Sequence, residues 1–134
     1  METQILRATE EILVVDDVPA ICCLLAGFLV TKGYRVQTTT SAGAACGLLA
    51  ATRFDLLIAD IHLDDRKNES GLEVIEFARR NQPSTPVIAI SGSALPDTVS
   101  QLLAFGVEAF LSKPILLGRL EEAVAKAIRK GRQH

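Results

Sequence analysis

The sequence predicts an α/β protein in which a parallel sheet of five strands is covered by helices on both faces. Continuous aliphatic runs without polar alternation carry this prediction, because they suit strands that are buried on both sides. Segments with helical spacing of apolar residues lie between the runs, as in a doubly wound sheet. Four of the runs end at residues able to do chemistry: Asp16-Asp17, Asp60, Ser91 and Ser112-Lys113-Pro114.

The first half of the chain predicts two strands, each followed by a helix. The first strand covers residues 12–15, and the helix after it covers 18–33, with Pro19 in its first turn and a glycine at its end. A second strand is expected over 34–38. Serine, a good N-terminal cap, then begins a helix of small residues over 41–51.

The middle of the chain repeats this pattern. A third strand ends at Asp60, and a polar stretch leads to Gly71. Apolar positions at helical spacing begin at Leu72, and the turn region over 81–86 ends this helix. The fourth strand then leads to Ser91.

The last third contains a helix over 96–105, the fifth strand over 109–111 and a final helix over 115–130. Five strands therefore alternate with five helices. Right-handed crossovers leave few topologies, of which the flavodoxin-like order 2-1-3-4-5 is the commonest with five strands. Its switch point lies between the first and third strands, where ligands bind and where Asp16, Asp17 and Asp60 would meet.

Length and composition predict one domain over residues 11–131 after a short flexible leader, 1–10. The chain has 134 residues, 49% of them apolar, with a net charge of −2 and no long basic block, so we expect no direct nucleic-acid binding. No apolar segment is long enough for a membrane helix or resembles a signal peptide, so we expect a cytoplasmic protein. Three cysteines without metal-ligand spacing are expected to be plain helix thiols.

The polar residues at the strand ends suit phosphoryl chemistry. Three neighbouring carboxylates raise one another's pKa unless a cation lies among them, and Mg2+ prefers oxygen ligands. A carboxylate can also attack phosphorus to give an aspartyl phosphate. Lys113 and the Ser91 hydroxyl would then hold the remaining phosphoryl oxygens.

This pattern resembles the receiver domain of two-component response regulators over about residues 12–130. The family's acidic pair matches Asp16-Asp17, its phosphoacceptor matches Asp60, its Ser/Thr matches Ser91 and its Lys-Pro matches Lys113-Pro114. The resemblance implies that Asp60 accepts a phosphoryl group from a phosphohistidine on a sensor histidine kinase or a phosphotransfer protein. The protein would then be a signalling switch and not an enzyme acting on other substrates.

The resemblance also implies a metal site and a switch. Asp17, Asp60 and the backbone carbonyl of His62 would hold Mg2+, with Asp16 contributing through water. The Lys-Pro bond would be cis. Ser91 and Phe110 would couple the phosphoryl group to an output face over 96–130, which would bind an output protein or a second copy.

Two features depart from the family pattern. Ten residues separate Asp60 from Gly71, where the family has about seven, so 64–70 is interpreted as a short surface insertion or a partner contact. His62, two residues after the phosphoacceptor, either faces the site or is an ordinary surface residue. Its imidazole is not expected to bind Mg2+.

Three other functions agree less well with the sequence. A phosphatase of the haloacid dehalogenase type needs a second Asp where this chain has His62, and a flavin or nucleotide binder would need a Gly-rich phosphate loop after the first strand. A degenerate receiver used only for binding conflicts with the intact acidic set. The sequence does not name the kinase, the output partner or the oligomeric state; its start at Met1 favours a stand-alone protein over a receiver cut from a hybrid kinase.

Overall fold

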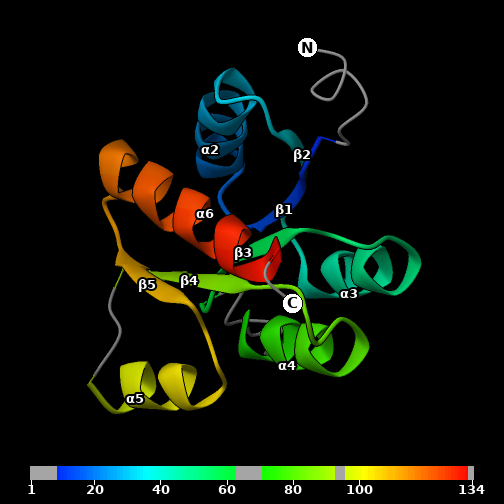
Figure 1. The fold of residues 1–134 in the computed structure, drawn as a ribbon. Coiled ribbons are helices and arrows are strands. Elements are labelled where there is room, and N and C mark those ends of the chain that lie inside the picture. The colour runs from blue at the N-terminus through cyan, green and yellow to red at the C-terminus, as the bar shows by residue number, and fades with distance from the viewer. Residues whose placement is uncertain (1–8, 63–70, 93–95, 133–134) are drawn as a thin grey trace.

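A five-stranded parallel sheet with helices on both faces forms the fold of this computed structural model, which describes residues 9–62, 71–92 and 96–132. The strand order is β2-β1-β3-β4-β5, which confirms the topology predicted from the sequence. Helices α2 and α6 cover one face, and α3, α4 and α5 cover the other (Figure 1). The strands and helices alternate along the chain as follows: β1 Glu11–Val15, α2 Pro19–Thr31, β2 Arg35–Thr39, α3 Ala42–Ala51, β3 Leu56–Asp60, α4 Gly71–Asn81, β4 Val87–Ser91, α5 Pro96–Ala104, β5 Ala109–Ser112 and α6 Leu117–Arg132.

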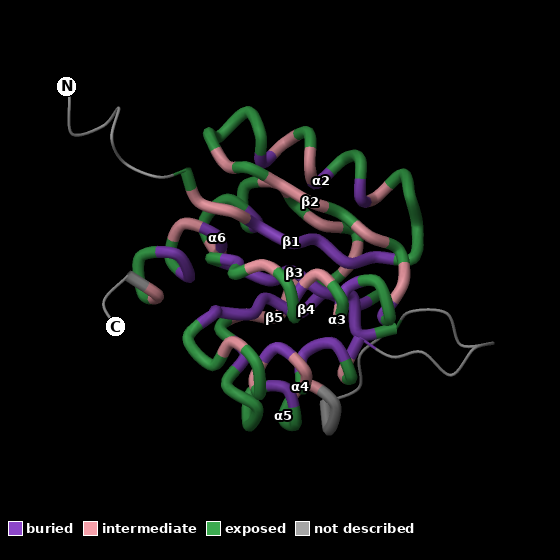
Figure 2. Tube along the Cα trace, turned by 90° about the vertical axis from the view of Figure 1, so that its right-hand side faces the viewer, coloured by how far each residue is buried: buried purple, intermediate pink, exposed green. Residues whose placement is uncertain are grey.

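The central strands form the core. Every residue of β3 and β4 is buried, whereas the outer strands β2 and β5 are only partly buried. The buried strands run through the middle of the molecule in Figure 2, with exposed residues on the outer sides of the helices. Alternate residues of a strand point to opposite faces, so the sheet separates two apolar clusters. Leu25 and Val124 belong to the cluster under α2 and α6, and Val74 and Leu102 belong to the cluster on the other face.

The predicted element boundaries differ from the structure by one or two residues. Strand β2 begins at Arg35 because the N–H of Tyr34 still bonds back to Leu29 beyond the end of α2. Helix α6 begins at Leu117, two residues later than predicted, after the cis peptide bond between Lys113 and Pro114. That cis bond agrees with the expectation from the resemblance. The proposed insertion at 64–70 and most of the leader lie outside the described residues.

Within residues 9–62, 71–92 and 96–132, no helix has the length and apolar character needed to cross a bilayer.

Candidate functional site: an acidic cluster at the strand ends

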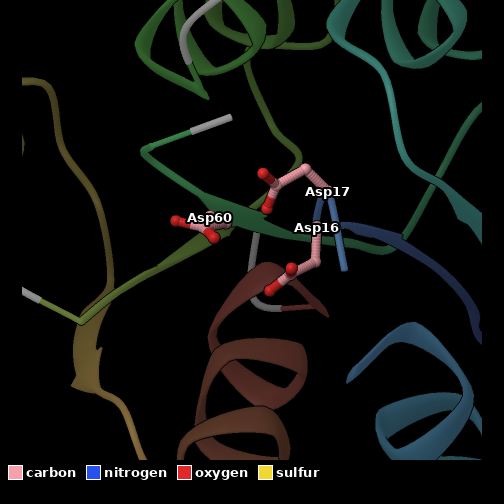
Figure 3. A group of neighbouring side chains, drawn as sticks. All are labelled: Asp16, Asp17 and Asp60. Carbon is pink, nitrogen blue, oxygen red and sulfur yellow. The ribbon is translucent and has the colours of Figure 1, made fainter. Parts of the chain in front are cut away.

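Three carboxylates meet where β1 and β3 end. One oxygen from each of Asp16, Asp17 and Asp60 lies within 4.8 Å of the others, as Figure 3 shows for the three side chains. Strands β1 and β3 are direct neighbours in register, so their last residues reach the same edge of the sheet. Asp16 and Asp60 are buried, whereas Asp17 is exposed. The cluster is therefore anchored in the core and open to solvent on the Asp17 side.

The two buried carboxylates are held in the same way. In each, Oδ1 accepts a hydrogen bond from the backbone N–H two residues later, from Val18 to Asp16 and from His62 to Asp60, both at 2.9 Å. This local turn is one that Asp side chains commonly form at the end of a strand. The bond to Asp16 also fixes Val18, the N-cap residue of α2. The second oxygen of each carboxylate, Oδ2, is left to contact Lys113.

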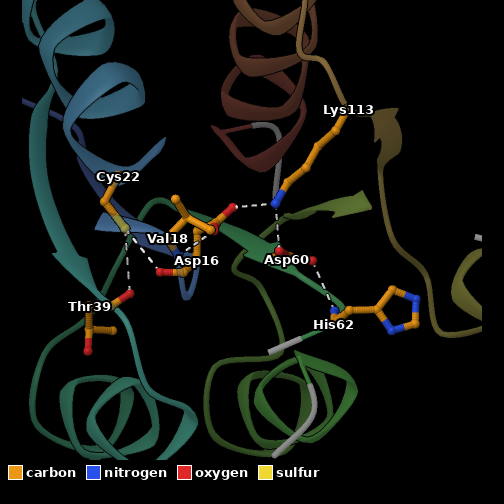
Figure 4. A network of polar contacts seen from close by, with 7 residues as sticks. All are labelled: Asp16, Val18, Cys22, Thr39, Asp60, His62 and Lys113. Carbon is orange, nitrogen blue, oxygen red and sulfur yellow. Dashed lines mark hydrogen bonds and ion pairs between the residues drawn. The ribbon is translucent and has the colours of Figure 1, made fainter. Parts of the chain in front are cut away.

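Lys113 bridges these two Oδ2 atoms from the end of β5. Its Nζ lies 2.8 Å from Asp60 Oδ2, a hydrogen bond, and 3.0 Å from Asp16 Oδ2 (Figure 4). The second contact is an ion pair not aligned as a hydrogen bond, so Asp16 Oδ2 is buried without a hydrogen-bond donor. One ammonium group thus faces three carboxylates. The cluster has an excess of negative charge and one buried oxygen able to accept another ligand.

The electrostatics of the cluster follow from this arrangement. Burial raises the pKa of the Asp16 carboxyl above its usual value, against the lowering effects of the Val18 N–H and Lys113, and Asp60 adds to the increase. Burial alone would lower the pKa of Lys113, but its close contacts with the carboxylates of Asp60 and Asp16 outweigh this effect and the pKa is raised. Lys113 is therefore charged at neutral pH, while Asp16 resists ionisation.

Two residues that support the site were not predicted from the sequence. The thiol of Cys22 is buried and donates to the backbone carbonyl of Asp16 at 3.3 Å, so this cysteine packs directly beneath the acidic pair. Gly71 begins α4 at a position where a Cβ would overlap the backbone carbonyl oxygen of Asp60. Its place after the polar stretch was the available signal for Gly71; Cys22 gave none, since a helix thiol is usually plain core.

The remaining predicted site residues lie on neighbouring strands. Ser91 ends β4 and is buried, and its backbone carbonyl accepts a hydrogen bond from the N–H of Lys113 at 2.9 Å. Phe110 is half-buried in β5 and packs against the apolar cluster on the α5 side. The His62 side chain is exposed and only its backbone N–H contacts Asp60. All of the predicted residues therefore belong to this edge of the sheet or to the strands that form it.

Oxygen ligands within 4.8 Å of one another, one of them buried without a donor, fit a hard divalent cation such as Mg2+. The fold and this site together define a flavodoxin-like α/β domain with an acidic pocket at the carboxyl ends of its parallel strands.

Residues 12–125 match the family model of the response regulator receiver domain, and the chain belongs to that family. It is 35% identical to the nitrogen assimilation regulatory protein NtrX of Azorhizobium caulinodans over 88% of this chain, and 38% identical to the response regulator protein PilR of Pseudomonas aeruginosa over 90%. The chain spans 26% of the length of each of these two proteins.

Comparison with solved structures supports the same family. A CheY-like response regulator receiver domain protein from Methanospirillum hungatei superimposes with a TM-score of 0.88 and 27% identity, covering 94% of this chain and 98% of that chain. The sensor histidine kinase AruS of Pseudomonas aeruginosa also matches, with 33% identity over 87% of this chain and 12% of its own length. Receiver domains are signalling switches of two-component systems, and they interact with sensor histidine kinases and output domains. They bind Mg2+ at an acidic pocket, with which the aspartate cluster is compatible.

Proposed function

We propose that Asp60 is the phosphoacceptor of a phosphorylation-dependent switch. The observation that carries the proposal is the bridge of Lys113 between Asp60 and Asp16 inside a cluster of three carboxylates. Such a cluster presents a nucleophile and a fixed positive charge at the same place, and phosphoryl transfer depends mostly on positioning and charge neutralisation. The donor would be a phosphohistidine on a sensor histidine kinase or a phosphotransfer protein.

In the proposed reaction a carboxylate oxygen of Asp60 attacks the phosphorus of the donor. The new O–P bond forms as the N–P bond breaks, and the electron pair of that bond returns to the imidazole of the donor, which takes up a proton. The Lys113 ammonium lies 2.8 Å from Asp60 Oδ2, where it would neutralise charge on the phosphoryl oxygens. The Ser91 hydroxyl would hold another of these oxygens from the neighbouring strand.

The metal site of the proposal consists of Asp17, Asp60 and the backbone carbonyl of His62, with Asp16 acting through water. When bound, Mg2+ would neutralise the negative charge that the donor phosphoryl group brings into the cluster. Asp17 is the exposed member and would receive the ion first from solvent. Asp16, whose carboxyl is held by Val18, would keep the ion's outer ligands oriented.

The test is phosphorylation by a small-molecule donor. The protein is incubated with acetyl phosphate and Mg2+, and its intact mass is measured. We expect one added phosphoryl group that is lost at high pH and is absent in Asp60→Asn. The matched control is Asp55→Asn, which removes an exposed carboxylate just before β3 begins. Equal labelling of Asp60→Asn and wild type would refute the assignment.

The proposal extends to the output. Movement of the Ser91 hydroxyl toward the phosphoryl group would leave room for Phe110 to rotate inward, and the face over 96–130 would change its affinity for an output protein or a second copy. Phe110 supports this role because it is only half-buried and lies on the strand that ends at Lys113. The proposal retains a signalling switch in the cytoplasm, without direct nucleic-acid contact, as expected from the sequence.

A further inference from the structure

The free edge of β5 borders a continuous groove. Strand β5 is last in the sheet and pairs with β4 alone. One groove of about 780 Å³ lies between this edge and α6, and a second of about 400 Å³ continues past the end of the strand. Leu111 and Arg119 line both grooves, so the two meet. The combined groove follows the whole length of β5.

Backbone groups of β5 face this groove. The register pairs Ala109 with Ile88 and Leu111 with Ile90, and the N–H of Lys113 bonds to Ser91 of β4. Alternation along a parallel strand therefore directs the backbone groups of Phe110 and Ser112 to the opposite side. Both residues line the part of the groove that continues past the end of the strand. Within the described part of the chain, these N–H and C=O groups have no strand partner. An unpaired strand edge with a groove beside it is suited to receive an extended peptide.

The walls of the groove are basic, although the chain as a whole is acidic. Its lining between β5 and α6 has four basic and two acidic residues, whereas the whole chain has a net charge of −2. Glu108 is already paired with Lys130 at 3.1 Å. Arg119 and Lys126 make no ion pair with any described residue and are exposed on one face of α6, two turns apart. The groove therefore has positive charge left to pair with an incoming segment.

We propose that this groove binds an extended acidic segment of a partner protein, which pairs with β5 as a sixth strand. Its backbone would bond to Phe110 and Ser112, and its carboxylates would pair with Arg119 and Lys126. Small apolar side chains, Ala123 and Ala127, form the α6 side and leave room for apolar residues of the segment. This inference names the chemistry of the output partner and rests on the proposed function for its coupling to Asp60.

The position of β5 explains how the two sites would be coupled. The groove continues to Lys113, the residue whose ammonium is bound to Asp60 and Asp16. Phe110 also lines this part of the groove. A phosphoryl group that draws Lys113 away from its present partners would shift the end of β5, and a segment bound to β5 would in turn alter phosphorylation, because coupling between two sites is reciprocal.

A second copy of the chain does not suit the groove. The groove of a second copy has the same excess of basic side chains, including Arg119 and Lys126. Like charges placed opposite one another oppose association. An acidic segment meets the opposite condition, which is why we favour it.

The experiment uses a fluorescein-labelled heptapeptide of alternating glutamate and valine as the probe. Binding is followed by anisotropy, and the bound surface by ¹⁵N NMR, with and without beryllofluoride and Mg2+. We expect shifts at the amides of Phe110 and Ser112 and tighter binding in one of the two states. Arg119→Ala and Lys126→Ala should each weaken binding about two- to fivefold, as for exposed ion pairs. The control Arg80→Ala, an exposed arginine on α4, should leave binding unchanged.

Two altered peptides and a lipid vesicle complete the test. A peptide with lysine in place of glutamate, and one with N-methylated valines, should bind far more weakly. Equal binding of either peptide would overturn the proposal, as would shifts of the β5 amides with phosphatidylserine vesicles but not with the probe. If Asp60 is phosphorylated but the probe binds in neither state, the groove inference is wrong and the proposed function stands. If the probe binds at β5 but Asp60 is not phosphorylated, the proposed function fails and the groove inference stands.

Discussion

Replacing Lys113 by methionine tests whether one ammonium group holds the acidic cluster together. The variant keeps the apolar stem of the side chain and removes its charge. Asp16 and Asp60 would then lie buried beside Asp17 with no cation among them. We expect the variant to be less stable than wild type without Mg2+, and to bind Mg2+ more tightly.

The size of both effects follows from the contacts. Breaking a buried ion pair costs about 3 to 5 kcal/mol, and we expect the lower part of that range or less, about 2 to 3 kcal/mol, because the Lys113 side chain is 22% exposed. For a domain of this length that corresponds to about 8 °C in Tm. An ammonium and a divalent ion sharing this cluster would repel each other by about 1 to 2 kcal/mol even at the dielectric constant of water, so removal of the ammonium should lower the Kd for Mg2+ about tenfold.

The assay is thermal unfolding over a Mg2+ titration, at neutral pH and low salt. The gap in Tm between Lys113→Met and wild type should narrow as Mg2+ is added, because binding to the folded state stabilises it. The control is Lys32→Met, which removes an exposed ion pair to Glu121 and should cost less than about 1 kcal/mol at every Mg2+ concentration. If Mg2+ stabilised Lys113→Met and wild type equally, Lys113 and the ion would not compete and the cluster would not be the metal site.

Two further predictions concern the supports of the cluster. Because burial raises the pKa of Asp16, the contribution of its protonated form to stability without Mg2+ is lost as the pH rises through the folded-state pKa. Asp16→Asn should therefore be more stable than wild type at pH 7 and lose that advantage near pH 4. Urea unfolding at both pH values measures this difference, and an advantage that grows at low pH would contradict the prediction. Gly71→Ala should lower the free energy of unfolding by about 1 to 3 kcal/mol, because the added methyl group presses on the Asp60 carbonyl. Gly47→Ala, in open space on α3, should raise it by about 0.5 to 1 kcal/mol. Equal effects of the two changes would show that Gly71 is not tightly packed.

The strands could be predicted because burial on both faces leaves a distinct mark on the sequence. Aliphatic runs without polar alternation located β1, β3 and β4 to within a residue. Their shared edge then brought Asp16, Asp17 and Asp60 together, since the carboxyl ends of parallel strands lie side by side. The predicted ends of helices and strands were less accurate, because local hydrogen bonds past a helix end, such as that from the Tyr34 N–H to Leu29, leave no mark in the apolar pattern.

Contacts inside the site could not be predicted in the same way. The sequence places two adjacent carboxylates after β1 but does not say that Asp16 is buried and paired with Lys113 while Asp17 is exposed. That difference depends on which side of the strand each residue faces, and a shift of one residue would reverse it. The groove along β5 was likewise invisible, because its lining combines a strand edge with residues of α6 such as Arg119 and Lys126.

The central claim is that the acidic cluster holds a phosphoryl group and transmits its presence to β5. The most direct measurement is a beryllofluoride titration with Mg2+, followed by ¹⁵N NMR, since this anion imitates a bound phosphoryl group. We expect saturable shifts at Lys113 and along residues 96–110, absent in Asp60→Asn and reduced over 96–110 in Ser91→Ala. Shifts in Asp60→Asn equal to those of wild type, or shifts confined to the cluster with none along 96–110, would contradict the account.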